Sequence, residues 1–223
     1  MLINHMKPAK NRYKDYFKNH YSAKFDDSDI ERDKRWFYSQ FQIIKSLISI
    51  FPASEILEIG SGFGGLYSFL NHKKYIGIEM DREVVNFAND FFKTDKFLNI
   101  SLEEFNTKKK FDYIFAIEVL EHLDNPKEGI AKIHNLLNNQ GMFIGTSPYP
   151  FKKNIDADRT HNFVLHPENW KRLFLNEGFS NVNLYPMSFF PSLWRISRYV
   201  NIKIPFYLPF KHFISTCLII AKK

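Results

Sequence analysis

The chain has 223 residues, with 31 Lys and Arg against 24 Asp and Glu and a formal charge of +7. This length suits one α/β domain with a modest extension, and no apolar run is long enough to predict a membrane-spanning helix. The single Cys217 excludes an intrachain disulfide, and Met1–Lys10 lacks the apolar stretch of a signal peptide. We therefore expect a cytoplasmic protein. The basic charge permits nucleic acid, an anionic membrane surface or phosphorylated substrates as partners and selects none of them.

Residues 1–51 are interpreted as a helical extension. Ser28 and Glu31 have the spacing of a capping box, and apolar residues then recur at helical spacing, which predicts a helix over about 28–50. Pro52 should end it.

From residue 52 onward, strand and helix patterns alternate, which predicts a second unit, a single α/β domain over 52–223. Strands are predicted at 55–59, 75–79, 97–100, 113–117, 142–146, 182–185 and 217–221, and helices at 66–71, 82–92, 126–138 and 167–177. This alternation indicates a Rossmann-like, mainly parallel sheet with helices on both faces.

A glycine-rich turn follows the first of these strands. Gly60, Gly62 and Gly65 have the spacing of the dinucleotide fingerprint, and Glu79 lies 19 residues after Gly60, where a ribose-binding acid belongs. Asp81 is the second candidate for that role. Glycines allow close backbone approach to a ligand, and the following helix would point free N–H groups at it. The pattern predicts a site for a nucleotide-like cofactor.

Glu58 separates the candidate cofactors. A central parallel strand should be apolar on both faces, so a carboxylate inside it needs a partner. The methionine end of S-adenosylmethionine offers a cationic amino group, and NAD offers none at that place. Glu58 therefore favours S-adenosylmethionine over a dinucleotide.

Several segments together resemble the class I S-adenosylmethionine-dependent methyltransferases, in particular the branch acting on small molecules or saccharides. The first two are the strand with its glycine turn at 58–65 and the second strand with its acid at 75–79. The others are the fourth-strand segment at 111–126, the helix-turn-strand at 136–148, the late helix at 166–179 and the closing strand at 218–223. The resemblance implies a seven-stranded sheet whose last strand is antiparallel, with S-adenosylmethionine as the cofactor.

The resemblance also implies roles for single residues. Gly60, Ser61 and Gly62 would lie against the methionine and ribose of the cofactor, Glu58 would anchor its amino group, Glu79 would hold the ribose and Met80 would pack on adenine; Ser101 and Leu102 would meet the adenine edge, and Ile117 and Glu118 would line the methionine side. Ser101 stands where many relatives carry Asp.

Three histidines are compared as a general base for a hydroxyl acceptor, because histidine titrates in the required range. His161 is the preferred base, since its loop should cover the acceptor pocket. His122 follows the fourth strand and either acts there or structures the turn. His166 is interpreted as the residue that leads into a helix. No metal site is expected.

Residues 187–213 form an aromatic and basic insertion before the last strand. It is interpreted as a lid packed on the domain, with a dimer contact or a peripheral membrane contact at the inner face of the membrane as alternatives. Similar chains resemble methyltransferases of polysaccharide, glycolipid or quinone pathways. The oligomeric state is left open.

We expect a methyltransferase that moves a methyl group from S-adenosylmethionine to a hydroxyl, before an amine or carboxylate, of a small molecule, saccharide or glycolipid. An RNA methyltransferase is one alternative, although motifs for adenine or cytosine methylation are lacking. A non-catalytic cofactor-binding partner subunit and an NAD-dependent oxidoreductase are the others.

Overall fold

The computed structural model describes residues 25–47, 49–51, 53–70, 73–155, 158, 160–189, 203–210 and 213–223. Residues 1–24 of the interpreted N-terminal extension and residues 190–202 in the middle of the insertion therefore lie outside the described residues.

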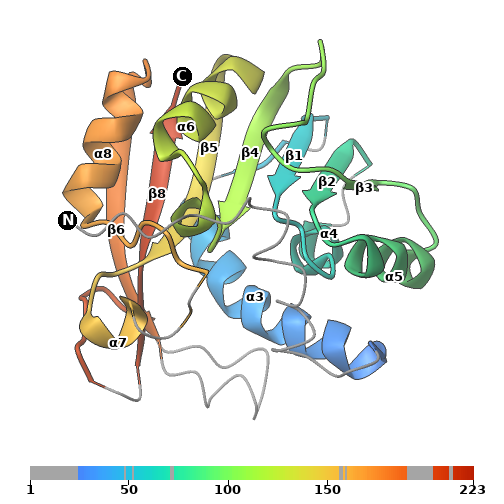
Figure 1. The fold of residues 1–223 in the computed structure, drawn as a ribbon, viewed down its shortest axis with the longest axis horizontal. Coiled ribbons are helices and arrows are strands. Elements are labelled where there is room, and N and C mark those ends of the chain that lie inside the picture. The colour runs from blue at the N-terminus through green and yellow to red at the C-terminus, as the bar shows by residue number, and fades with distance from the viewer. Residues whose placement is uncertain are drawn as a thin grey trace.

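One mixed sheet organises the described part of the chain (Figure 1). Its strands are β1 (Ile56–Ile59), β2 (Tyr75–Glu79), β3 (Phe97–Asn99), β4 (Phe111–Ile117), β5 (Leu137–Pro148), β6 (Asn181–Phe189), β7 (Lys203–Ile204) and β8 (Ile214–Lys222), in the order β3-β2-β1-β4-β5-β8-β6-β7. The first five run parallel, and β8 is antiparallel to both β5 and β6. The predicted fold class is confirmed, and the two-residue β7 adds an edge strand that the sequence did not predict.

Helices cover both faces of this sheet. They are α3 (Asp27–Leu47), α4 (Gly65–Leu70), α5 (Arg82–Phe92), the 3₁₀ turn η1 (Leu120–His122), α6 (Pro126–Leu136), α7 (Lys152–Ile155) and α8 (Pro167–Asn176). α6 and α8 pack on one face through residues such as Ile130 and Trp170, and α3, α4 and α5 pack on the other through residues such as Phe41 and Leu66 (Figure 1). Each side is thus a separate apolar layer, as expected for a parallel sheet buried on both faces.

The start of α3 corrects one local prediction. The capping box is formed by Asp26 and Asp29 and not by Ser28 and Glu31: the backbone N–H of Ser28 donates to Asp26 Oδ1 at 2.7 Å, and the N–H of Asp26 donates to Asp29 Oδ2 at 3.2 Å. A carboxylate and a hydroxyl are both good acceptors at this position, so residue types alone did not select between the two registers.

The junction between α6 and β5 is the second correction. The helix was predicted to end at Asn138 and the strand to begin at Met142. The helix ends at Leu136 instead, because Leu137 adopts extended backbone angles and pairs directly with Phe111 of β4. A register shift between Phe111 and Tyr113 then absorbs the extra residues.

The described ends of the aromatic insertion pack on the domain. The Ser188 hydroxyl donates to the Phe206 carbonyl at 2.6 Å, and the Leu208 N–H donates to Ser215 Oγ at 3.0 Å. The Tyr207 ring stacks on Tyr149 with centroids 4.0 Å apart. These contacts show that this part of the segment packs on the domain, and its role as a lid stays a prediction. Among the described residues, no helix combines the length and apolarity needed to cross a bilayer.

Removal of the Phe41 side chain tests whether α3 belongs to the core of the domain. Phe41 is 1% exposed and stacks on Phe69 of α4 at 5.3 Å. We expect Phe41→Ala to lower the free energy of unfolding in urea by about 3–5 kcal/mol, because a buried ring leaves a cavity. Phe51→Ala is the control: this side chain is 67% exposed, and its loss should change stability by no more than about 0.5 kcal/mol. Equal effects of the two changes would show that α3 is peripheral.

Candidate active site

The carboxyl ends of β1, β2 and β4 meet at one edge of the sheet. β1 lies between β2 and β4, and the chain leaves β1 toward one side and returns to β4 on the other. A crevice forms at such a switch point in open parallel sheets, and ligands bind there. The residues that follow these three strands therefore define the candidate site.

The turn after β1 has the backbone geometry that the glycine pattern predicted. Gly60, Gly62 and Gly64 have φ angles of +66°, +49° and +83°. A Cβ atom on Gly60 would lie 2.5 Å from Val119 Cγ2, whereas one on Gly62 would meet no atom within 4 Å. Gly60 thus lets the turns after β1 and β4 touch, and Gly62 leaves one face of the turn open to a ligand.

Glu79 at the end of β2 holds this turn in place. Its carboxylate accepts hydrogen bonds from the N–H groups of Gly62 at 3.2 Å, Met80 at 2.6 Å and Asp81 at 3.1 Å. Burial raises the pKa of Glu79, although these three N–H groups oppose that effect. Asp81 has a different task, because its Oδ1 caps α5 by accepting from the N–H groups of Glu83 and Val84.

Ser61 adds a buried polar atom to the turn. Its side chain lies over Gly77, where a Cβ would come within 2.8 Å of Ser61 Oγ, and this hydroxyl has no hydrogen-bond partner among the described residues. A carboxylate at the strand end, an open glycine face and an unsatisfied hydroxyl together fit the ribose and methionine parts of S-adenosylmethionine.

Glu58 is buried in β1, 1% exposed, and the Tyr75 hydroxyl donates a hydrogen bond to its Oε2. Sequence reasoning expected a ligand amine as the partner of this carboxylate and did not foresee Tyr75. A phenol donor from the neighbouring strand already reduces the cost of burying Glu58.

The residues predicted near adenine occupy the turns after β2 and β3. Met80 is partly buried at the end of β2. Ser101 is 7% exposed, and its Oγ accepts from the Glu104 N–H at 3.2 Å, so this side chain caps a turn. Leu102 is 4% exposed and belongs to the core on the α6 side of the sheet.

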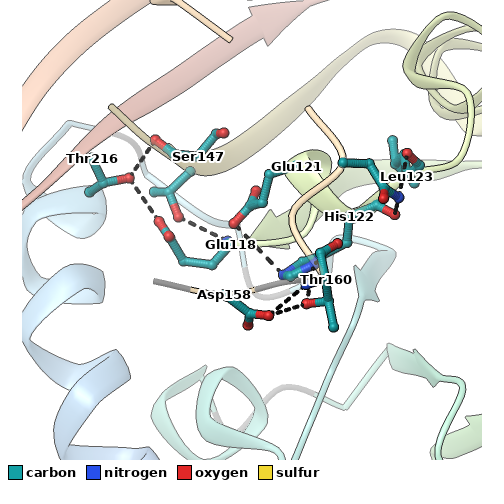
Figure 2. A network of polar contacts seen from close by, with 10 residues as sticks. Glu118, Glu121, His122, Leu123, Ser147, Asp158, Thr160 and Thr216 are labelled. Atoms are coloured by element: carbon teal, nitrogen blue, oxygen red, sulfur yellow. Dashed lines mark hydrogen bonds and ion pairs between the residues drawn. The ribbon is translucent and has the colours of Figure 1, made fainter. Parts of the chain in front are cut away.

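Glu118 follows the buried Ile117 at the end of β4 with a φ of +53°, which is strained for a residue that is not glycine. Thr146 holds the strained residue, because the Glu118 N–H lies 3.2 Å from its carbonyl oxygen and 3.1 Å from its Oγ1. The Thr216 hydroxyl donates to Glu118 Oε1 at 2.7 Å (Figure 2). Burial raises the pKa of Glu118 more than its hydrogen bonds from Thr216 and Thr146 lower it.

Glu121, His122 and His161 form an acid–histidine cluster beside Glu118. One potential ligand atom from each of the three side chains lies within 4.8 Å of the other two, and the centroids of the two imidazole rings are 4.9 Å apart. Glu121 is 0% exposed, and neither carboxylate oxygen has a hydrogen-bond partner among the described residues. Burial first, and then the charge of Glu118, hold the pKa of Glu121 well above its ordinary range.

The loop after β5 folds back to complete this cluster. The N–H groups of Asn162 and Phe163 donate to the Glu121 carbonyl at 2.8 and 3.0 Å. Thr160 lies beside His122 Nδ1, with its carbonyl oxygen at 3.2 Å and its hydroxyl oxygen at 3.1 Å. The Thr160 hydroxyl in turn lies 2.7 Å from Asp158 Oδ1 (Figure 2).

The structure therefore brings His122 and His161 together, as two candidates for one role, and it leaves His166 outside the cluster. His166 precedes α8 and lies 3.3 Å from the Tyr149 hydroxyl. Sequence reasoning missed Glu121. The sequence signal that could have indicated it is the three-residue spacing between Glu118 and Glu121. One short turn at this spacing places both acids at the same edge of the sheet.

Comparisons with known proteins agree with this geometry. Residues 57–143 match the sequence family described as "Methyltransferase domain". N-methyltransferase 4 of Papaver somniferum is 30% identical over 100 residues, which are 40% of this chain and 28% of that protein. The chain thus spans less than a third of this curated relative.

Solved structures show the same fold at low sequence identity. A Thermotoga maritima structure, described as an S-adenosylmethionine-dependent methyltransferase and possible histamine N-methyltransferase, has a TM-score of 0.71 at 18% identity and covers 97% of this chain and 100% of its own. Phosphoethanolamine N-methyltransferase 2 of Haemonchus contortus, in complex with phosphomonomethylethanolamine and S-adenosylhomocysteine, has a TM-score of 0.69 at 13% identity and covers 98% of this chain and 60% of its own.

Residues 57–143 thus match a methyltransferase domain, and the fold is the one that solved S-adenosylmethionine-dependent methyltransferases have. The enzyme class and the cofactor that the sequence predicted agree with these findings.

The buried carboxylate of Glu79 gives a pH test of this geometry. Because its pKa is raised above 4.5 in the folded protein, its contribution to stability is fully present below pH 4.5 and is lost as the pH rises through the folded value. Glu79→Gln does not titrate. In ligand-free protein, the unfolding free energy of wild type relative to Glu79→Gln should therefore fall as the pH rises from about 4 to 8, measured by urea unfolding. A difference that stays constant or grows with pH would contradict a raised pKa.

Proposed function

We propose that this chain transfers a methyl group from S-adenosylmethionine to a hydroxyl group of a small molecule, saccharide or glycolipid. The observation that carries the proposal is the acid–histidine cluster next to the glycine turn. Val119, two residues before Glu121, approaches the Gly60 backbone so closely that a Cβ would not fit between them. The cofactor turn and the titratable side chains therefore share one edge of the sheet.

The cofactor residues follow from the predicted roles and fit the geometry. Glu79 would exchange its hydrogen bond with Gly62 for ribose hydroxyls, and the open face of Gly62 would let the ligand approach the backbone. Glu58 would receive the amino group of the ligand beside Tyr75. When bound, S-adenosylmethionine supplies an electrophilic methyl group on a sulfonium, which an acceptor displaces in line.

Alignment of the acceptor with the methyl group and the sulfur lowers the activation barrier of such a displacement by about 7–11 kcal/mol in favourable cases. A hydroxyl acceptor must also lose its proton. His122 and His161 are the described side chains at this edge with suitable chemistry, and Asp158, whose pKa is lowered in part by these two histidines, carries the negative charge that would orient them. The cluster thus favours oxygen as the accepting atom.

An amine acceptor is the second candidate, because the names of two relatives specify N-methyltransferases. In that case the carboxylates of the cluster would attract a protonated amine. Incubation of source-cell extract with the protein and methyl-labelled S-adenosylmethionine, followed by mass spectrometry, would identify the acceptor. A label on oxygen supports the proposal, and a label on nitrogen overturns the choice of a hydroxyl.

Glu79→Ala tests the cofactor site. We expect S-adenosylmethionine to bind at least tenfold more weakly by calorimetry, since a charged hydrogen-bonded group contributes on the order of 1.4 kcal/mol or more. Asp81→Ala is the matched control. It removes a nearby carboxylate that caps α5, so it should cost about 1 kcal/mol of stability and leave the affinity almost unchanged. Unchanged affinity in Glu79→Ala would remove Glu79 from the site.

His161→Ala tests the acceptor side. With the acceptor identified, turnover should fall on the order of 100-fold while the affinity for S-adenosylmethionine is kept, because only handling of the hydroxyl proton is lost. His166→Ala, a change to a neighbouring histidine outside the cluster, should retain turnover. Full activity of His161→Ala would exclude this residue from the reaction.

A further inference from the structure

We propose that Glu121, His122 and His161 bind one divalent first-row transition-metal ion and leave coordination positions open for an oxygen of the acceptor. The sequence did not predict a metal site. The binding of the ion is argued from the cluster alone, and its role toward the acceptor rests on the proposed function.

The buried carboxylate of Glu121 is the first observation. It is 0% exposed, and neither oxygen accepts a hydrogen bond from the described residues. Among the described residues, its ion-pair contact is with His122, whose Nε2 lies 4.0 Å from Glu121 Oε1. A carboxylate buried in this way is costly unless it is paired or coordinates a metal ion. Because one ligand atom from each of His122 and His161 lies within 4.8 Å of this carboxylate, a shared cation would pair with it.

The orientation of His122 is the second observation. Its Nδ1 lies 3.2 Å from the Thr160 carbonyl oxygen, a contact that only an N–H group can make favourably. A neutral ring with its proton on Nδ1 presents the lone pair of Nε2 toward Glu121. Metal-ligating histidines are held in this manner, with the second nitrogen donating to a carbonyl or carboxylate. The Thr160 hydroxyl and Asp158 extend that support.

The donor set indicates the kind of ion. Two imidazole nitrogens and one carboxylate oxygen suit Zn²⁺, Mn²⁺ or a similar ion better than Ca²⁺, which takes oxygen ligands. Three protein ligands also leave positions for water or substrate, as catalytic sites do. The three ligand atoms now lie up to 4.8 Å from one another. Around an ion with bonds of about 2.0–2.2 Å they would lie closer together, and small side-chain rotations would bring them to that separation.

The surrounding charges favour a cation. Glu118 and Asp158 both interact electrostatically with this cluster, which therefore gathers three carboxylates and two imidazoles in a chain whose overall charge is +7. In the ion-free cluster the like charges of Glu118 and Glu121 oppose each other. A divalent ion would neutralise that repulsion at the place where an acceptor must bind.

The ion would fix the acceptor hydroxyl and ease the loss of its proton. A C–O bond then forms to the methyl carbon, the C–S bond breaks with its electron pair going to sulfur, and the hydroxyl proton passes to solvent. In this scheme His122 and His161 act as ligands of the ion, and the ion-bound hydroxyl loses its proton to solvent, which replaces the role of proton acceptor that the proposed function gives to these histidines.

Metal binding to the full chain tests the proposal without any acceptor. Mn²⁺ and Zn²⁺ would be titrated separately into chelator-treated protein by calorimetry, with Mn²⁺ also followed by electron paramagnetic resonance. We expect one equivalent of at least one ion, at least about tenfold weaker binding in Glu121→Gln and His161→Ala, and unchanged binding in the control His166→Ala. S-adenosylmethionine affinity and circular dichroism would be measured for each variant.

The absence of saturable binding of either ion to wild type, or equal affinity in both ligand variants, would overturn the proposal. The wild-type titration stands even if one variant fails to fold, and Glu121→Gln should fold because the amide has nearly the same size as the carboxyl group and carries no charge. Metal binding without S-adenosylmethionine binding would refute the proposed function alone. S-adenosylmethionine binding without metal binding would refute the metal site alone.

Discussion

The close approach of Val119 to Gly60 is the constraint on which the arrangement of this site depends. It brings the turn after β4 against the turn after β1, and only a residue without a side chain permits that contact. Glu79 adds a second tie, because its carboxylate joins the end of β2 to the Gly62 backbone. These short contacts fix the ends of the three neighbouring strands β1, β2 and β4 relative to one another.

The same edge concentrates buried acids in a basic chain. Glu58 lies one residue before the end of β1, Glu79 ends β2, and Glu118 and Glu121 follow β4. Burial raises the pKa of Glu79, Glu118 and Glu121. Buried carboxylates at these positions reduce the stability of the fold, so a sequence selected for packing alone would have apolar residues there. Phenol, hydroxyl and backbone donors offset part of this cost at Glu58, Glu79 and Glu118. Among the described residues, the two carboxylate oxygens of Glu121 have no hydrogen-bond partner, which separates this acid from the other three.

The sequence predicted most of the fold because strand periodicity and glycine spacing are local signals. β2 and α5 were predicted with their observed bounds, and the glycine-rich turn follows β1 where it was predicted. The Glu121–His122–His161 cluster could not be predicted, since it depends on the backbone hydrogen bonds that fold 160–163 onto η1. The partner of Glu58 was missed for a related reason: register between β1 and β2 brings Tyr75 near it, and register is a tertiary property.

The order of strands in the sheet has a consequence for synthesis. β6 joins the sheet only through β8, which lies between it and β5. A ribosome makes β6 first, at about 5–20 residues per second, so this strand emerges with its buried residues Met187 and Phe189 still lacking the neighbour that covers them. During this interval the nascent chain exposes an unpaired apolar strand of the kind that chaperones recognise, while β1–β5 are already complete.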